Sequence, residues 1–202
     1  MMIMKINELD SFCFSIIACS VSDIYDFLSK ERHKQKIMYV ELDVQEIYFD
    51  GIYSNKSDTI GKGLIYKPDI VQEFSIILGS GRDFLELLSK KLSLHFEIKS
   101  ILMEFNTQKS EIIRNGLFVY DGITSEKVRE VLGYWSSFGK MEFIDTGSPM
   151  YFEKTEYYQR NNIAEKINKD IILEYGKKLG VDFEDERIFE TEGKSIYIDQ
   201  EA

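Results

Sequence analysis

Residues 14–30 read FSIIACSVSDIYDFLSK and residues 74–90 read FSIILGSGRDFLELLSK, so the same stretch occurs twice, sixty positions apart. The two copies align without a gap and are identical at nine of seventeen positions. With twenty residue types, about one identity would arise by chance. The repeat therefore predicts that one structural unit has been duplicated within the chain.

Each copy has the pattern of a strand, a short turn and an amphipathic helix. In the first copy, Ser20 or Ser22 is placed to cap the helix, with Asp23 near its positive end. In the second copy, Gly79-Ser80-Gly81 forms the turn. The apolar residues that follow recur at helical spacing and are expected to face the core: Phe84, Leu85, Leu88 and Leu92.

A third version of the unit is predicted from Leu117 onward, on hydrophobic pattern alone. The apolar run LFVYDG leads into a segment, Thr124–Ser137, whose apolar residues have helical spacing. These residues are Val128, Val131, Leu132 and Trp135. We therefore expect a helix over Thr124–Ser137.

Several other segments have clear periodicity. Alternating or short apolar runs predict strands at Met38–Val44, Glu46–Asp50, Leu64–Tyr66, His95–Phe105, Lys140–Ile144 and Ser195–Asp199. A last helix is predicted from Asn162 to Leu179, where isoleucines recur every four residues and Gly180 provides a stop.

Helices that alternate with strands predict an α+β fold, in which about four helices cover a mixed β-sheet. The 202 residues fit a single compact domain, 1–202. Within it the duplication suggests two fused repeat units, about 12–73 and 74–133, followed by a helix-containing segment, 134–202. Only two prolines occur, and no proline-rich linker divides the chain.

The charge of the chain favours some partners over others. Asp and Glu number 35 against 25 Lys and Arg, which gives a formal net charge of −10. Such a field repels phosphate backbones, so nucleic-acid binding is disfavoured. It attracts basic partners, although acidity also serves solubility alone.

Cys13 and Cys19 are the two cysteines. In an extended strand they would lie ~20 Å apart, too far for a disulfide, which fits a reducing, cytoplasmic compartment. The run Ile16–Cys19 loosely resembles the site of lipoprotein acylation, but the preceding Glu8 and Asp10 are untypical of a signal peptide. No apolar run approaches the ~20 residues of a membrane span, so no membrane association is expected.

No catalytic, metal or cofactor site is predicted. The turn Gly79-Ser80-Gly81 could hold phosphate at a helix start, but it lacks the further residues of a dinucleotide or P-loop motif and reads as a capped turn. His33 and His95 have no Cys or His at ligand spacing. The chain is accordingly expected not to be an enzyme.

Carboxylates and tyrosines are the remaining candidates for binding. Glu41 and Asp43 share the outer face of a predicted strand. A denser acidic cluster, suited to a basic partner, comprises Asp182, Glu184, Asp185 and Glu186. Tyr157 and Tyr158 lie in an aromatic stretch of the kind enriched at protein interfaces.

These features predict a protein-binding protein, an inhibitor or immunity-type neutraliser of a basic partner such as a toxin. One alternative is a small-molecule-binding protein or enzyme that uses a cleft between the duplicated units. That alternative requires a pocket lined by the Ser80–Gly81 turn or by Glu41 and Asp43. A third hypothesis is a self-associating structural component.

Overall fold

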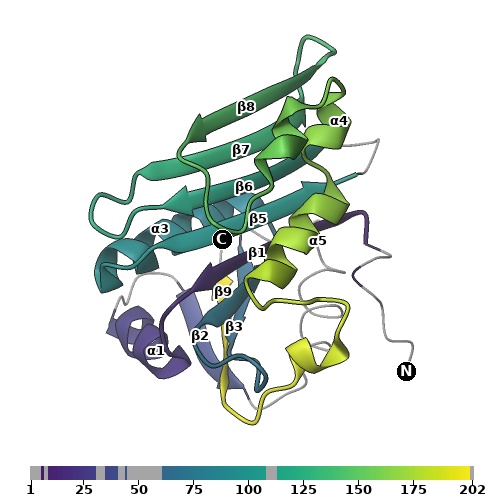
Figure 1. Ribbon diagram of the computed structural model, residues 1–202. Helices are drawn as coiled ribbons and strands as arrows, with labels where there is room; N and C mark the ends of the chain where they lie inside the picture. The colour runs from purple at the N-terminus through teal and green to yellow at the C-terminus, as the bar shows by residue number, and fades with distance from the viewer. Residues whose placement is uncertain are drawn as a thin grey trace.

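The computed structural model describes residues 6, 9–30, 35–40, 44, 61–107 and 113–200. Within these ranges the chain forms one nine-stranded sheet, ordered β2-β9-β3-β4-β1-β5-β6-β7-β8, with every neighbouring pair antiparallel (Figure 1). The strands are β1 (Ser11–Ile17), β2 (Gln35–Val40), β3 (Lys62–Tyr66), β4 (Ser75–Gly79), β5 (Ser100–Asn106), β6 (Arg114–Tyr120), β7 (Lys127–Trp135), β8 (Met141–Gly147) and β9 (Ser195–Gln200).

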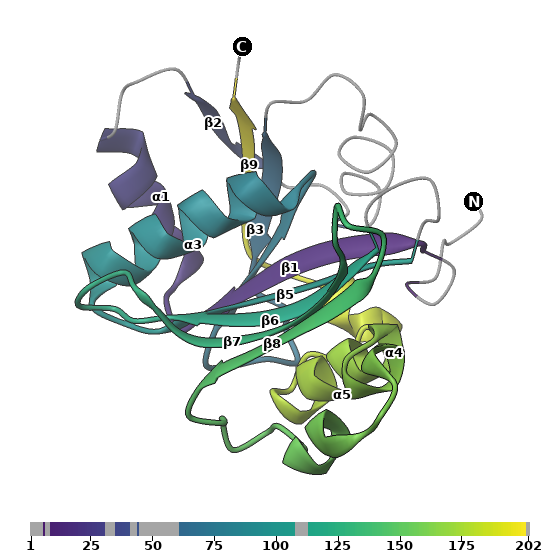
Figure 2. The same ribbon diagram turned by 90° about the horizontal axis from the view of Figure 1, so that it is seen from above.

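Helices cover both faces of this sheet. The helices are α1 (Val21–Lys30), α3 (Arg82–Phe96), α4 (Ile163–Lys166) and α5 (Lys169–Lys178), with 3-10 turns η3 (Thr155–Gln159) and η4 (Glu186–Phe189). Figure 2 shows α1 and α3 on one face and α4 and α5 on the other. Two apolar cores result, one on each face, so most residues of the central strands β4, β1 and β5 are buried.

The two similar segments both form a strand followed by a helix, β1 with α1 and β4 with α3. β1 and β4 pair directly, with the equivalent residues Ile16 and Ile76 opposite each other. Serines common to both copies connect the units, since Ser89 Oγ donates to Ser15 Oγ at 2.8 Å across the interface of α3 and β1. This arrangement is that of two like units packed side by side, and their common origin remains a hypothesis.

The α+β class is confirmed, but two parts of the prediction are wrong. The sheet is antiparallel throughout rather than mixed. The described chain has three helices of ten residues or more, and α4 has only four residues, so the expected four helices are not reached.

The helix expected over Thr124–Ser137 is strand β7 instead. Val131 and Leu132 are adjacent in the strand and belong to the two different cores. Because side chains on both faces of β7 are buried, apolar and polar residues do not alternate along it as they do in a strand with one exposed face. The apolar residues that it contains are spaced as in an amphipathic helix. Val128 and Trp135, which completed that helical stripe, are 40% and 46% exposed.

The predicted helix Asn162–Leu179 is interrupted. Ile167 adopts an extended backbone conformation, and the Asn168 side chain accepts a hydrogen bond from the Ile171 amide at 3.1 Å, which starts α5 anew. Ile167 is nevertheless fully buried, so the four-residue spacing continues across the break. The predicted start of a strand at His95 was also early, because α3 continues to Phe96.

Other strands agree with the sequence. β3, β8 and β9 overlap Leu64–Tyr66, Lys140–Ile144 and Ser195–Asp199. Glu46–Asp50 and part of Met38–Val44 lie outside the described residues. None of the helices in the described ranges is long and apolar enough to cross a membrane.

Candidate binding site

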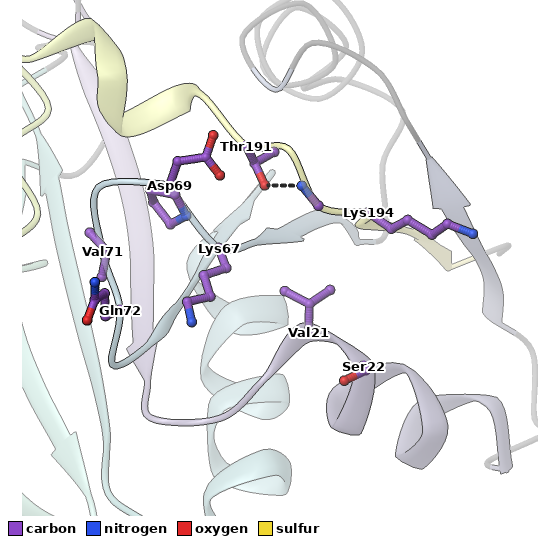
Figure 3. Close-up of a pocket in the computed structure, with 10 residues that line it drawn as sticks. Val21, Ser22, Lys67, Asp69, Val71, Gln72, Thr191 and Lys194 are labelled. Carbon is purple, nitrogen blue, oxygen red and sulfur yellow. Dashed lines mark hydrogen bonds between the residues drawn. The ribbon is translucent and has the colours of Figure 1, made fainter.

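A pocket of about 480 Å³ opens where α1 begins (Figure 3). Its other walls are the loop 67–74 between β3 and β4 and the segment 191–194 that leads into β9. The lining residues are Val21, Ser22, Lys67, Pro68, Asp69, Val71, Gln72, Thr191, Gly193 and Lys194. Segments far apart in the sequence therefore meet at one end of the sheet.

The beginning of α1 is well defined. The Ser20 hydroxyl accepts a hydrogen bond from the Asp23 amide at 3.1 Å and donates to the Asp23 carboxylate at 2.6 Å. Ser20, one of the two predicted residues, is thus the cap. Val21 and Ser22 face the pocket from the first turn, where backbone amides have no partner within the helix and favour negative charge.

Loop 67–74 and the segment before β9 are joined by one backbone–backbone hydrogen bond and by one hydrogen bond from a backbone amide to the Asp69 side chain. The Asp69 amide donates to the Glu190 carbonyl at 3.0 Å, and the Glu192 amide donates to Asp69 Oδ1 at 2.9 Å. Gly193 donates to Thr191 Oγ1 at 3.2 Å, as Figure 3 shows. The pocket rim is therefore a fixed structure held mainly by main-chain groups.

These hydrogen bonds also place the Asp69 carboxylate beside the acidic segment 182–192. We define the acidic surface as five exposed carboxylate residues: Asp69, Glu184, Glu186, Glu190 and Glu192. Residues 182–192 contain six carboxylates and one cation, and loop 67–74 has two carboxylates, Asp69 and Glu73, and one cation, Lys67. Ile70, next to Asp69, is 44% exposed. An apolar side chain beside several carboxylates is a suitable contact for a basic protein surface.

The predicted acidic cluster divides into two kinds of residue. Asp182 pairs with Lys177 at 2.6 Å, and Asp185 pairs with Arg187 at 2.6 Å while capping η4. Hydrogen bonds from Arg187 hold the pKa of Asp185 below its usual range. Glu184 and Glu186 are exposed, so they are the members of the cluster most accessible to a partner.

The predicted tyrosines lie elsewhere, beside α5. Tyr157 is half-buried, donates a hydrogen bond to Glu174 at 2.9 Å and lies 4.2 Å beneath the Arg160 guanidinium. Tyr158 is 4% exposed and hydrogen-bonds to Glu153 and Tyr175. Tyr158 is thus a core residue with almost no surface to offer a partner.

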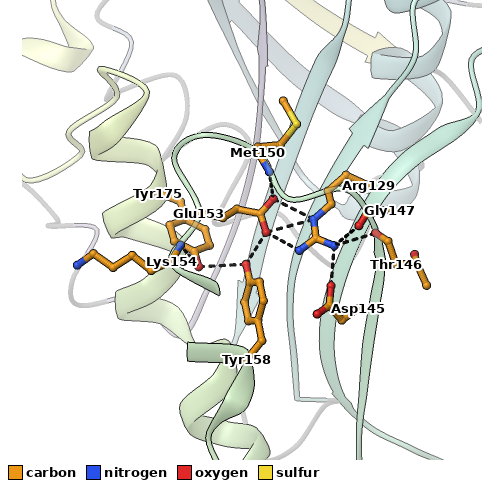
Figure 4. A network of polar contacts seen from close by, with 9 residues as sticks. All are labelled: Arg129, Asp145, Thr146, Gly147, Met150, Glu153, Lys154, Tyr158 and Tyr175. Carbon is orange, nitrogen blue, oxygen red and sulfur yellow. Dashed lines mark hydrogen bonds and ion pairs between the residues drawn. The ribbon is translucent and has the colours of Figure 1, made fainter. Parts of the chain in front are cut away.

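Tyr158 belongs to a buried network centred on Arg129 of β7 (Figure 4). Arg129 is 1% exposed and forms ion pairs with Glu153 at 2.5 Å and with Asp145 at 2.6 Å. The same guanidinium donates to the carbonyls of Thr146 and Gly147 at 2.9 and 3.0 Å. Burial alone would lower the pKa of Arg129, but its hydrogen bonds to the two carboxylates raise it.

Such a satisfied network is structural rather than reactive. Glu153 also accepts hydrogen bonds from the Met150 amide at 2.7 Å and the Tyr158 hydroxyl at 2.7 Å, which fixes the segment after β8 against the sheet. Burial and the bonds to Tyr175 and Glu153 raise the pKa of Tyr158, so its hydroxyl stays protonated. The network joins η3 and α5 to β7 and β8.

Ser80, Gly81 and His95 do not line the pocket. Ser80 Oγ accepts a hydrogen bond from the Lys62 amide at 3.0 Å, so the Gly79-Ser80-Gly81 turn is tied to β3. His95 stacks on Phe27 with ring centroids 3.9 Å apart. Glu41, Asp43 and His33 lie outside the described residues.

Sequence reasoning missed Asp69 and Arg129. The turn Lys67-Pro68-Asp69 is a recognisable loop signal, but its contact with Glu190 depends on tertiary structure. In the described part of the chain, no group of three or more His, Cys, Asp or Glu side chains could hold a metal ion. The chain has no significant match among protein-family models, curated proteins or solved structures.

Proposed function

We propose that this protein binds a basic protein through the acidic surface, in the manner of an inhibitor or immunity-type neutraliser. The observation that carries the proposal is the junction of Asp69 with Glu190 and Glu192, which places the Asp69 carboxylate beside an acidic segment more than a hundred residues away in the sequence. A fixed backbone presents these carboxylates. Electrostatic complementarity of this kind speeds association and selects partners of opposite charge.

The position of the charges supports the same interpretation. Lys177 and Arg187 compensate Asp182 and Asp185, whereas Glu186, Glu190 and Glu192 add exposed negative charge. Ile70, which is 44% exposed, follows Asp69, the residue that hydrogen-bonds to the backbone of Glu190 and Glu192. An interface usually needs such an apolar centre within a polar rim.

The test compares the whole chain with a triple variant, Glu186→Lys, Glu190→Lys and Glu192→Lys, as affinity ligands for proteins of the source cells. Only backbone atoms of Glu190 and Glu192 form the junction, so the variant should keep the fold. A protein retained by the parent chain is expected to be basic. Its association rate with the variant should fall roughly 10-fold to 1000-fold at low salt.

The matched control reverses three exposed carboxylates outside the acidic surface: Asp26→Lys, Glu126→Lys and Glu156→Lys. It has the same net charge as the triple variant. The control should retain the partner with a rate near that of the parent. The proposal would be refuted if the parent chain retained no basic protein, or if the association rate fell equally in both triple variants.

The pocket supports a second candidate, binding of a small anion. Its volume of about 480 Å³ lies within the range of ligand sites, and Lys67 and the first turn of α1 both favour negative charge, against the opposing charge of Asp69 in the same lining. Lys194 also lines it, although Figure 3 shows its side chain extending away from the others. This candidate differs from the predicted cleft, because Ser80 and Gly81 do not line the pocket.

Thermal denaturation with 10 mM inorganic pyrophosphate tests this second candidate. A dissociation constant near 1 mM would raise Tm by roughly 3 to 5 °C. Lys67→Gln should abolish most of the shift, whereas Lys99→Gln, an exposed lysine absent from the pocket lining, should leave it unchanged. No shift in the parent, or equal shifts in both variants, would exclude an anion site here.

A further inference from the structure

One wall of the pocket is also part of the acidic surface. This wall is the short segment 190–194, which leads into β9. Thr191 and Gly193 line the pocket. Glu190 and Glu192, which alternate with them in the sequence, are exposed members of the acidic surface. A single segment therefore borders the pocket and carries exposed carboxylates.

Asp69 has the same double role in the opposite wall. It lines the pocket (Figure 3) and also belongs to the acidic surface. The junction consists of its two hydrogen bonds, from its amide to the Glu190 carbonyl at 3.0 Å and from the Glu192 amide to its Oδ1 at 2.9 Å. Both the separation of these pocket walls and the spacing of the carboxylates depend on the junction.

The third wall, the beginning of α1, is attached to the far end of the same loop. Loop 67–74 leads directly into β4, whose first residue, Ser75, is fully buried. The Ser75 hydroxyl donates to the carbonyl of Cys19 at 2.6 Å, just before α1 begins. The loop is therefore fixed to the α1 wall at one end and to segment 190–194 through Asp69.

An anion in the pocket meets suitable groups on all three walls. Lys67 lines it from the loop, and the first turn of α1 lines it with amides that have no partner within the helix. The Thr191 hydroxyl accepts a hydrogen bond from the Gly193 amide at 3.2 Å, so its own proton can be donated to a ligand. Asp69 opposes an anion, but its Oδ1 already accepts the Glu192 amide.

We propose, on the basis of the anion site and the acidic surface described above, that an anion of the phosphate class in the pocket holds the junction closed and thereby orders the acidic surface. A ligand that contacts both sides of the junction binds the closed form and not the open one. It therefore shifts the local equilibrium toward the closed form. Such coupling is reciprocal, so a basic partner that requires the closed junction also strengthens anion binding.

Amide hydrogen exchange measured by NMR, with 10 mM inorganic pyrophosphate or with NaCl of equal ionic strength, tests the proposal. For a dissociation constant near 1 mM, exchange of the Asp69 and Glu192 amides should slow about 10-fold, because the closed form is favoured by one plus the ratio of ligand concentration to dissociation constant. The control is the Ser136 amide, which donates to the Lys140 carbonyl at 2.8 Å in the turn between β7 and β8. Its exchange rate should not change.

Two variants connect the slower exchange to the pocket. Lys67→Gln should abolish it, and Lys99→Gln, outside the pocket lining, should retain it. A rise in Tm without slower exchange at Asp69 and Glu192 would overturn the coupling and leave the anion site intact. Equal slowing at Ser136, or in Lys67→Gln, would also overturn the coupling. If pyrophosphate changed neither Tm nor exchange, the anion site would be excluded and the coupling with it, whereas binding of a basic protein is tested separately by the charge-reversal triples.

Discussion

The molecule uses its carboxylates in two different ways. Beside β8, Glu153 and Asp145 bind the buried guanidinium of Arg129, and the Glu153 side chain is fully buried. At the other region, around loop 67–74, Glu186, Glu190 and Glu192 are exposed. The same chemical group thus fastens the fold in one place and provides surface charge in the other.

This difference shows why a count of acidic residues says little about function. A buried carboxylate must be paired, because an uncompensated charge in the interior costs several kcal/mol. An exposed carboxylate is screened by water and contributes little to stability. Removing a buried partner should therefore change folding, whereas reversing exposed charges should change binding alone.

The largest expected effect follows from Arg129→Met. The substitution leaves Glu153 and Asp145 without their cation and should lower the free energy of unfolding by about 3 to 5 kcal/mol. Urea denaturation measures the change directly. The matched control is Arg187→Met, which removes an exposed arginine paired with Asp185 and should cost at most about 1 kcal/mol. Equal losses in the two variants would remove the distinction between buried and exposed pairs.

A smaller effect is expected at the junction beneath the acidic surface. Asp69→Ala removes the acceptor of the Glu192 amide and should lower the free energy of unfolding by about 1 kcal/mol. Amide hydrogen exchange at Glu192 should also become faster. Asp69→Asn keeps an oxygen acceptor and should preserve the slow exchange. If the alanine variant exchanges no faster than the parent, the hydrogen bond does not hold loop 67–74 to the acidic segment 182–192.

The smallest expected effect concerns pH and Glu104. This carboxyl is 7% exposed, and burial raises its pKa although Arg114 and Arg82 act in the opposite direction. When the pKa of a carboxyl is higher in the folded state than in the unfolded state, the group stabilises the fold at low pH. This stabilisation is lost as the pH rises through the folded-state pKa. Relative to Glu104→Gln, the parent should therefore become less stable as the pH rises above about 4. Urea midpoints across this range measure the trend, and a rising trend would contradict it.

The sequence predicted the elements whose periodicity was unambiguous. The repeated segments showed an apolar run followed by helical spacing, and both form a strand and a helix. β3, β8 and β9 were also expected. β7 was not, because Val131 and Leu132 enter the cores on opposite faces and their spacing fits a helix equally well.

The candidate site was predictable only in part. The acidic run at 182–186 is visible in the sequence, and Glu184 and Glu186 are indeed exposed. Its continuation through Glu190, Glu192 and Asp69 depends on contacts between distant segments. Arg129 could not be identified, because a charged residue within an expected amphipathic helix is ordinarily placed on the solvent side.

The most direct test of the acidic surface is the dissociation constant of the parent chain for the basic protein that it retains, compared with that of the two charge-reversal triples. Both triples carry the same net charge and differ only in position. Binding should weaken at least about 10-fold at low salt in the acidic-surface triple, Glu186→Lys, Glu190→Lys and Glu192→Lys. The dissociation constant should stay within about 2-fold of the parent value in the control triple, Asp26→Lys, Glu126→Lys and Glu156→Lys. Equal weakening by both triples would show that total charge, and not this surface, governs binding.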